Sequence, residues 1–211
     1  MAPINNIPFL NYQLNYLKHF GVQKVILSVG YLHEKITNYY KNNFNGIEIK
    51  YSIEDEPMGT GGGIRLAMQH GNDTELLVLN GDSFFDVDIK SFYDFHIQQN
   101  AQISLALRNV NNAARYGTIT INKQQQIISF KEKSGLAKEG LINGGVYILN
   151  KNLFLNNTPS TTNFSIEKDF FETQLQHLMI KGFGCNQYFI DIGIPQDYQK
   201  AQHDFKNFKY R

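Results

Sequence analysis

The stretch "LLVLNGDSFFDVDI" (Leu76–Ile89) decides the fold of this 211-residue chain. Its first four residues are all apolar, which is typical of a strand buried on both faces of a parallel sheet. The strand runs directly into Asn80-Gly81 and then Asp82, the first of three carboxylates. Asn-Gly is a common turn pair, so an ordinary turn would explain the stretch. The alternative is a site for a cation and phosphates at the end of the strand.

The segments around this stretch alternate between strand and helix patterns. The predicted helices are "FLNYQLNYLKHFG", "LHEKITNYYKNNF" and "GIRLAMQHG", and the predicted strands are "VQKVILSVG" and "IEIKYSI". This alternation predicts βαβ units and a mainly parallel sheet in the first half. From Asn100 onward, short strand-like segments predict mixed or antiparallel pairing, followed by helices from Ser165 and from Pro195. We therefore predict an α/β fold with an open mixed sheet, in a single domain that spans residues 1–211.

The composition excludes several classes of function. The formal charge of +1, from 20 Lys+Arg and 19 Asp+Glu, gives no basic footprint for nucleic acid or an anionic membrane. No apolar stretch reaches the length of a transmembrane helix, and no signal peptide is visible. The single Cys185 excludes an intrachain disulfide framework and is typical of a reducing compartment, so we expect a cytoplasmic protein. No Cys/His metal spacing and no G-x-S-x-G elbow occur.

Polar clusters follow several of the predicted strands. In an open α/β sheet, ligands bind at the carboxyl ends of the strands. "EDEPMGTGGG" (residues 54–63), "NGD" (residues 80–82) and "DIG" (residues 191–193) all fall at such ends. Glycines that open a helix allow a phosphate to approach backbone N–H groups, although they also allow a simple tight turn. Asp191 would equally suit a cap of the final helix.

Two well-known glycine-rich motifs fit this loop poorly. No Lys-Ser/Thr pair follows the glycines, so the loop is not a P-loop. A dinucleotide fingerprint is also disfavoured, because the three carboxylates Glu54–Glu56 would repel a pyrophosphate. Later in the chain, "SFKEKSG" has the pattern of a solvated strand end. The glycines of "RYGTITI" and "LINGGVYIL" indicate close approach of a ligand or of another backbone.

The order of these clusters is more specific than any one of them. "EPMGTGGG", "LNGDSFFDVD", "RYGTITI", "SFKEK", "LINGGVYIL" and "YFIDIGIPQDY" resemble, in sequence and order, the sugar-1-phosphate nucleotidyltransferases. The likeness runs from Met1 to about Asp204 and is greatest to members that use GTP and a heptose 1-phosphate. It implies a Rossmann-like sheet with helices on both faces. The implied reaction joins a sugar 1-phosphate to a nucleoside triphosphate and releases pyrophosphate.

The resemblance also implies roles for individual residues. Asp82 and Asp191 are similar to the two carboxylates that hold Mg²⁺, a cation that is usually bound by one or two carboxylates together with substrate phosphates. Lys133 is similar to the residue that faces the sugar phosphate, and Glu132 to the one that holds sugar hydroxyls. The rest of the sugar pocket is implied to be Tyr116, Gly117, Asn143 and Gly144, and the nucleotide-binding residues Gly59, Thr60, Gly61 and Gly81. Asp86 and Asp88 are expected to be solvated or capping groups.

One departure from the family bears on activity. The family opens with a strand, a G-x-G-T-R loop and a Pro-Lys-Pro segment, whereas "MAPINNIPFL" resembles the residues just after them. The resemblance therefore implies that the first strand of the sheet is absent. The strands Val22–Val29 and Leu76–Leu79 would then each lack a neighbour or close on each other, and we expect the chain as given to be weakly active or inactive. Arg65 and the lysines of residues 131–133 are the remaining candidate counter-charges for a triphosphate.

Other readings stay open from the sequence. A nicotinamide dehydrogenase would use the glycine loop for pyrophosphate, and a non-catalytic paralogue would bind a sugar phosphate or a partner subunit. A different sugar or base within the same family is a further alternative. No feature fixes the oligomeric state, so a homo-oligomer is also possible.

Overall fold

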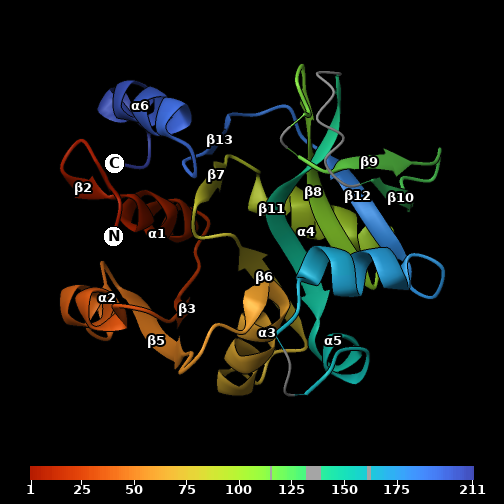
Figure 1. Cartoon of the computed structure of the whole chain (residues 1–211), viewed down its shortest axis with the longest axis horizontal. Coiled ribbons are helices and arrows are strands. Elements are labelled where there is room, and N and C mark those ends of the chain that lie inside the picture. The colour runs from red at the N-terminus through yellow and green to blue at the C-terminus, as the bar shows by residue number, and fades with distance from the viewer. Residues whose placement is uncertain (115, 132–138, 161–162) are drawn as a thin grey trace.

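The computed structural model describes residues 1–114, 116–131, 139–160 and 163–211 as a mixed α/β structure (Figure 1). The helices are α1 (Phe9–His19), α2 (His33–Tyr40), α3 (Gly59–Ala67), α4 (Ile89–Gln98), α5 (Lys151–Asn156) and α6 (Pro195–Asp204). A π-helix, η2, covers Ile166–Glu172, and short 3-10 turns cover Met68–His70 and Phe205–Asn207. None of the described helices is long and apolar enough to cross a membrane.

The strands fall into separate hydrogen-bonded groups. Their bounds are β1 (Pro3–Ile4), β2 (Ile7–Pro8), β3 (Lys24–Val29), β4 (Asn43–Phe44), β5 (Ile47–Ile53), β6 (Glu75–Leu79), β7 (Ser83–Phe85), β8 (Ile103–Val110), β9 (Thr118–Ile121), β10 (Ile127–Lys131), β11 (Gly140–Asn150), β12 (Ile180–Gly184) and β13 (Phe189–Asp191). The large sheet has the order β10-β9-β11-β8-β12, with β6 also on β11, and a smaller sheet has the order β3-β5-β4. Because β8 to β11 pair antiparallel while β12 runs parallel to β8, the predicted mixed pairing is confirmed.

The strands of the first half do not form the one mainly parallel sheet that the sequence pattern predicts. β3 pairs in parallel with β5, whereas β6 pairs antiparallel with β11. Among the described residues, β3 and β6 do not pair with each other. Within the described part of the chain, each of these strands is therefore paired on one side only, as predicted, and the two strands do not close on each other.

A groove of about 520 Å³ separates β3 from β6. Its apolar lining comes from both strands, from the inner side of α1 and from α3, and it includes Leu14, Leu17, Val25, Leu27, Leu77, Leu79 and Ile64. The end nearest the carboxyl ends of the strands is polar, with Ser28, Glu54 and Asn80. Apolar side chains that face water cost free energy, and unpaired strand edges are open to pairing with another strand, so this groove is a weak point of the fold.

Helix α1 carries apolar side chains on two sides and so joins two cores. Its Tyr12 and Tyr16 pack with Phe205 and other aromatic rings near the C-terminus, while Leu14 packs against the β3–β5 side. Figure 1 accordingly shows the N-terminus and the C-terminus close to each other beside α1 and α6. α1 also holds the turn after β6, because the buried amide of Gln13 donates hydrogen bonds to the backbone oxygens of Asn80 and Ser83, both at 2.8 Å.

The glycine-rich segment is a helix and not the loop that its composition predicts. Residues 59–63 form the first turns of α3, although each glycine in a helix costs about 1 kcal/mol relative to alanine. Close packing explains the exception. A Cβ atom on Gly61 would lie 2.1 Å from a ring carbon of Phe164, and one on Gly63 would lie 2.5 Å from a carboxylate oxygen of Glu54. The backbone N–H of Gly61 also donates to the Phe164 carbonyl oxygen at 2.9 Å.

We expect Gly61→Ala to lower the free energy of unfolding by about 1–3 kcal/mol, since overpacking of this kind commonly has that cost. Helix propensity alone would predict a gain, because alanine is the better helix former. Urea denaturation measures the sign. Gly184→Ala is the matched control, because a Cβ there meets no atom within 4 Å. Equal or higher stability of Gly61→Ala would show that Phe164 can move aside.

Candidate active site

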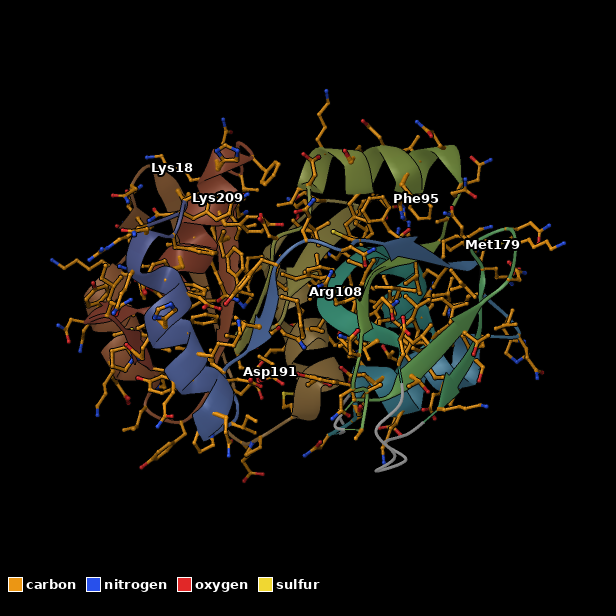
Figure 2. All side chains as sticks on the ribbon, turned by 90° about the horizontal axis from the view of Figure 1, so that it is seen from above. Lys18, Phe95, Arg108, Met179, Asp191 and Lys209 are labelled. Carbon is orange, nitrogen blue, oxygen red and sulfur yellow. The ribbon has the colours of Figure 1, made fainter. Side chains whose placement is uncertain are left out.

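Asp82 and Asp191, predicted to act together, lie side by side in the structure. β7 and β13 pair antiparallel so that Asp191 is opposite Ser83. The backbone N–H of Ile192 donates to the carbonyl oxygen of Asp82 at 2.9 Å, which continues this ladder to Asp82 itself. In Figure 2, Asp191 lies near the middle of the molecule, between α6 and the large sheet. Two strand ends more than a hundred residues apart in sequence are thus joined by backbone pairing.

The two carboxylates influence each other electrostatically. Partial burial raises the pKa of Asp82, and the negative charge of Asp191 raises it further, with a smaller contribution from Glu167. A local excess of negative charge with reduced access to water favours a bound cation. Asp191 does not cap the final helix, because its Oδ1 accepts from the N–H of Gly193 at 2.8 Å and Ile194 occupies the N-cap position.

The carboxylate oxygens of Asp82 and Asp191 suit a hard cation that also binds water or substrate oxygens. Within the described part of the chain, no group of three or more His, Cys, Asp or Glu side chains is arranged to hold a metal ion. Asp82 and Asp191 would therefore supply two oxygen ligands and leave the remaining positions to water and phosphate oxygens. Mg²⁺ is commonly bound in this way, so the residues present fit the predicted cation.

A pocket of about 550 Å³ lies against this carboxylate pair. Its lining includes six residues that the sequence assigned to the site: Asp82, Tyr116, Gly117, Asn143, Gly144 and Asp191. It also includes Lys131, a candidate counter-charge, and three charged residues that the sequence assigned to no ligand, namely Glu167, Lys168 and Glu172. Glu132 and Lys133 lie outside the described residues. The pocket therefore gathers the described members of the predicted sugar site with the predicted metal ligands.

An irregularity in β11 shapes one wall of this pocket. The register of β11 against β8 shifts between Asn143 and Tyr147, where Gly145 has a φ of +73°. A Cβ on Gly144 would lie 2.2 Å from a ring carbon of Phe85, so the backbone runs directly over that ring. The Asn143 side chain is held on both sides: its Oδ1 accepts from the N–H of Gly145 at 3.0 Å, and its Nδ2 donates to the Tyr147 hydroxyl at 2.6 Å.

The predicted nucleotide-binding residues lie in the neighbouring groove. Gly59, Thr60 and Gly81 line the groove between β3 and β6, and Asn80 lines both this groove and the pocket. Gly61 instead packs against Phe164. The residues predicted to bind the sugar and those predicted to bind the nucleotide are thus adjacent at the turn after β6.

Arg65 is not a free counter-charge for phosphates. Its Nη1 donates to the backbone oxygen of Leu155 at 2.6 Å and to the Oγ1 of Thr158 at 2.7 Å. The guanidinium group therefore binds the C-terminal end of α5 and is not oriented toward a phosphate. Of the candidate counter-charges, Lys131 lines the pocket.

The comparisons with known proteins agree with this site. The chain matches the nucleotidyl transferase family over residues 1–207 and belongs to that family. It is 46% identical over 208 residues to the D-glycero-alpha-D-manno-heptose 1-phosphate guanylyltransferase of Aneurinibacillus thermoaerophilus, a match that covers 99% of this chain and 89% of the relative. The corresponding enzyme of Campylobacter jejuni is 44% identical over 198 residues, covering 94% of this chain and 86% of the relative.

A solved structure gives the same picture. HddC from Yersinia pseudotuberculosis complexed with GMP-PN aligns with a TM-score of 0.85 at 34% identity, covering 98% of this chain and 89% of HddC. The family predicted by resemblance and its α/β fold are thereby confirmed.

Proposed function

We propose that this chain transfers GMP from GTP to D-glycero-α-D-manno-heptose 1-phosphate and releases pyrophosphate. The observation that carries the proposal is that Asp82 and Asp191 are joined at one wall of a pocket that Asn143 also lines. The residues predicted to bind the nucleotide line the adjoining groove. The identity of 46% to a heptose 1-phosphate guanylyltransferase supports the choice of substrates.

In the proposed reaction, an oxygen of the sugar phosphate attacks the α-phosphorus of GTP. A new P–O bond forms, the bond between the α- and β-phosphates breaks, and pyrophosphate leaves. Both reactants are anions, so the protein must hold them together against their repulsion. Asp82 and Asp191 would hold Mg²⁺, which, when bound, neutralises and orients phosphate oxygens.

The other residues bind and orient the substrates. Asn143 keeps one N–H of its amide for an oxygen of the sugar, because Tyr147 and Gly145 fix the rest of the group. Lys131 supplies positive charge at the pocket wall. For Glu132 and Lys133 we keep the roles implied by resemblance, hydroxyl and phosphate binding. Gly59, Thr60 and Gly81 would contact the nucleotide.

The test is a comparison of substrates on the purified chain. With GTP and Mg²⁺, we expect pyrophosphate release to be fastest with heptose 1-phosphate and slower with mannose 1-phosphate or glucose 1-phosphate. Thymidine and uridine triphosphates should replace GTP poorly. Binding of heptose 1-phosphate without any turnover, both by residues 1–211 and by a chain extended upstream by the family's opening strand and loop, would favour a non-catalytic sugar-phosphate-binding protein. A faster rate with mannose 1-phosphate would reassign the sugar and leave the reaction class intact.

A further inference from the structure

Glu167 has a set of contacts that the roles above do not use. It lies in the first turn of η2 and lines the pocket beside Asp82 and Asp191. Its Oε2 accepts hydrogen bonds from the hydroxyls of Thr60 at 3.1 Å and Ser165 at 2.8 Å. Its Oε1 accepts from the hydroxyl of Tyr147 at 3.4 Å. One carboxylate therefore connects α3, η2 and β11.

The protons of these three hydroxyls all converge on Glu167. The Thr60 Oγ1 already accepts from the N–H of Ile166 at 3.0 Å, and the Ser165 Oγ accepts from the N–H of Lys168. A hydroxyl has one proton to donate, and in both cases the carboxylate receives it. The arrangement is therefore directional and not a mutual contact of polar groups.

The Tyr147 hydroxyl follows the same rule. Its ring is fully buried, and its oxygen accepts from the Asn143 amide and interacts with the Asn80 side chain. Both partners are amides acting as donors, so the phenolic proton goes to Glu167. Without the carboxylate, the buried Tyr147 hydroxyl would lose its acceptor, and its orientation, which receives the Asn143 N–H, would no longer be fixed.

The two ends of this network belong to different substrates. Thr60 lies on the nucleotide side, in the groove between β3 and β6, whereas Asn143 lies in the sugar pocket. Hydrogen bonds from Thr60 through Glu167 and Tyr147 to Asn143 connect the two sides. Its shape sets the distance between a nucleotide held by Thr60 and a sugar held by Asn143.

We propose that Glu167 is a positioning residue that aligns the nucleotide side and the sugar side of the site through Thr60 and Tyr147. This inference rests on the proposed function. The consequence is specific: loss of Glu167 weakens the binding of both substrates, whereas loss of either neighbour weakens the binding of one.

The experiment measures binding by calorimetric titration of GTP and, separately, of heptose 1-phosphate. For Glu167→Ala we expect the dissociation constants of both ligands to rise about tenfold, the order of effect of losing hydrogen bonds to a charged group. Thr60→Val should raise that of GTP alone, and Tyr147→Phe that of heptose 1-phosphate alone. Glu167→Gln keeps an acceptor oxygen and should recover part of the loss for both ligands.

Folding is checked by thermal melting of each variant, and Asp94→Asn on α4 is a control for the removal of an exposed acidic group. If Glu167→Ala does not fold, Glu167→Gln with the two neighbour variants carries the test. Unchanged affinities in a folded Glu167→Ala, or a change for one ligand only, would overturn the positioning role. A wild-type chain that binds neither ligand would instead overturn the proposed function, so the two failures are distinguishable.

Discussion

Asp82→Asn and Asp191→Asn are each expected to lower the rate of Mg²⁺-dependent pyrophosphate release by about 10²–10³-fold, the usual cost of losing one electrostatic contact to developing charge. Asparagine keeps the size and one oxygen of the side chain but removes the charge that holds a cation. The rate is measured in an intact enzyme, that is, a chain that also carries the family's opening strand and G-x-G-T-R loop, with saturating GTP and sugar 1-phosphate over a range of Mg²⁺ concentrations. Asp88→Asn is the matched control, because Asp88 caps α4 through the N–H of Ser91 and asparagine caps a helix equally well.

The same variants should gain stability, which separates a functional loss from misfolding. Burial and the charge of Asp191 raise the pKa of Asp82 in the folded state above its ordinary value. A raised carboxyl pKa means that the folded state is favoured at low pH and loses stability as pH rises through the folded-state pKa. At neutral pH the charged pair is therefore a cost, which either asparagine removes. Unchanged turnover in either variant, or a lower melting temperature in both, would contradict the two-carboxylate site.

The pairing of Asp82 with Asp191 was predicted by the likeness to the family, since strand patterns show only that each carboxylate follows an apolar strand. The structure joins the two through the antiparallel β7–β13 pair and not at the edge of one parallel sheet. Asp88 was likewise predictable, since a cap depends on residues three positions away. Asp86 was not, because the prediction of a solvated group is wrong: its carboxylate binds Lys209 at 2.7 Å and Tyr210 at 2.8 Å, more than a hundred residues further along the chain.

Side-chain contacts between distant segments account for the other differences. Gln13, which holds the turn before Asp82, looks like an ordinary polar position of an amphipathic helix, and its partners are more than sixty residues away. Glu167 looks like an acidic residue in the first turn of a helix, a favourable position for reasons unrelated to a ligand. The glycines of α3 mislead in the opposite direction, because packing against Phe164 overrides their poor helix propensity.

The largest effect is expected from a strand added to the groove between β3 and β6. Both strands present an unpaired edge to this groove, and its lining is largely apolar. The family's opening segment, a strand followed by a G-x-G-T-R loop, has the form that such a groove would accept. We therefore expect a chain extended upstream of Met1 by this segment to unfold at higher urea concentration than residues 1–211 alone.

The extension should raise the rate of pyrophosphate release by about 10³–10⁵-fold, which is the range that a single cationic group can contribute to phosphoryl transfer. The physical reason is charge. Glu54 lines the groove on the nucleotide side, and Arg65, the candidate counter-charge in α3, is bound to Leu155 and Thr158 at the end of α5. The arginine of the added loop would meet the triphosphate, while the added strand would hold β3 and β6 at a fixed separation.

Two variants of the extension separate these contributions. Replacing the loop arginine by alanine should keep the gain in stability and lose most of the gain in rate. Two prolines in the middle of the added strand should lose both, because proline lacks the N–H that a central strand needs. Equal pyrophosphate release from the extended chain and from residues 1–211 would show that the groove does not limit catalysis. The turn after β6 would then be held well enough by the contacts that it already has, which are the two hydrogen bonds of Gln13 and the backbone bonds of Asn80 to Gly145 and of Ile192 to Asp82.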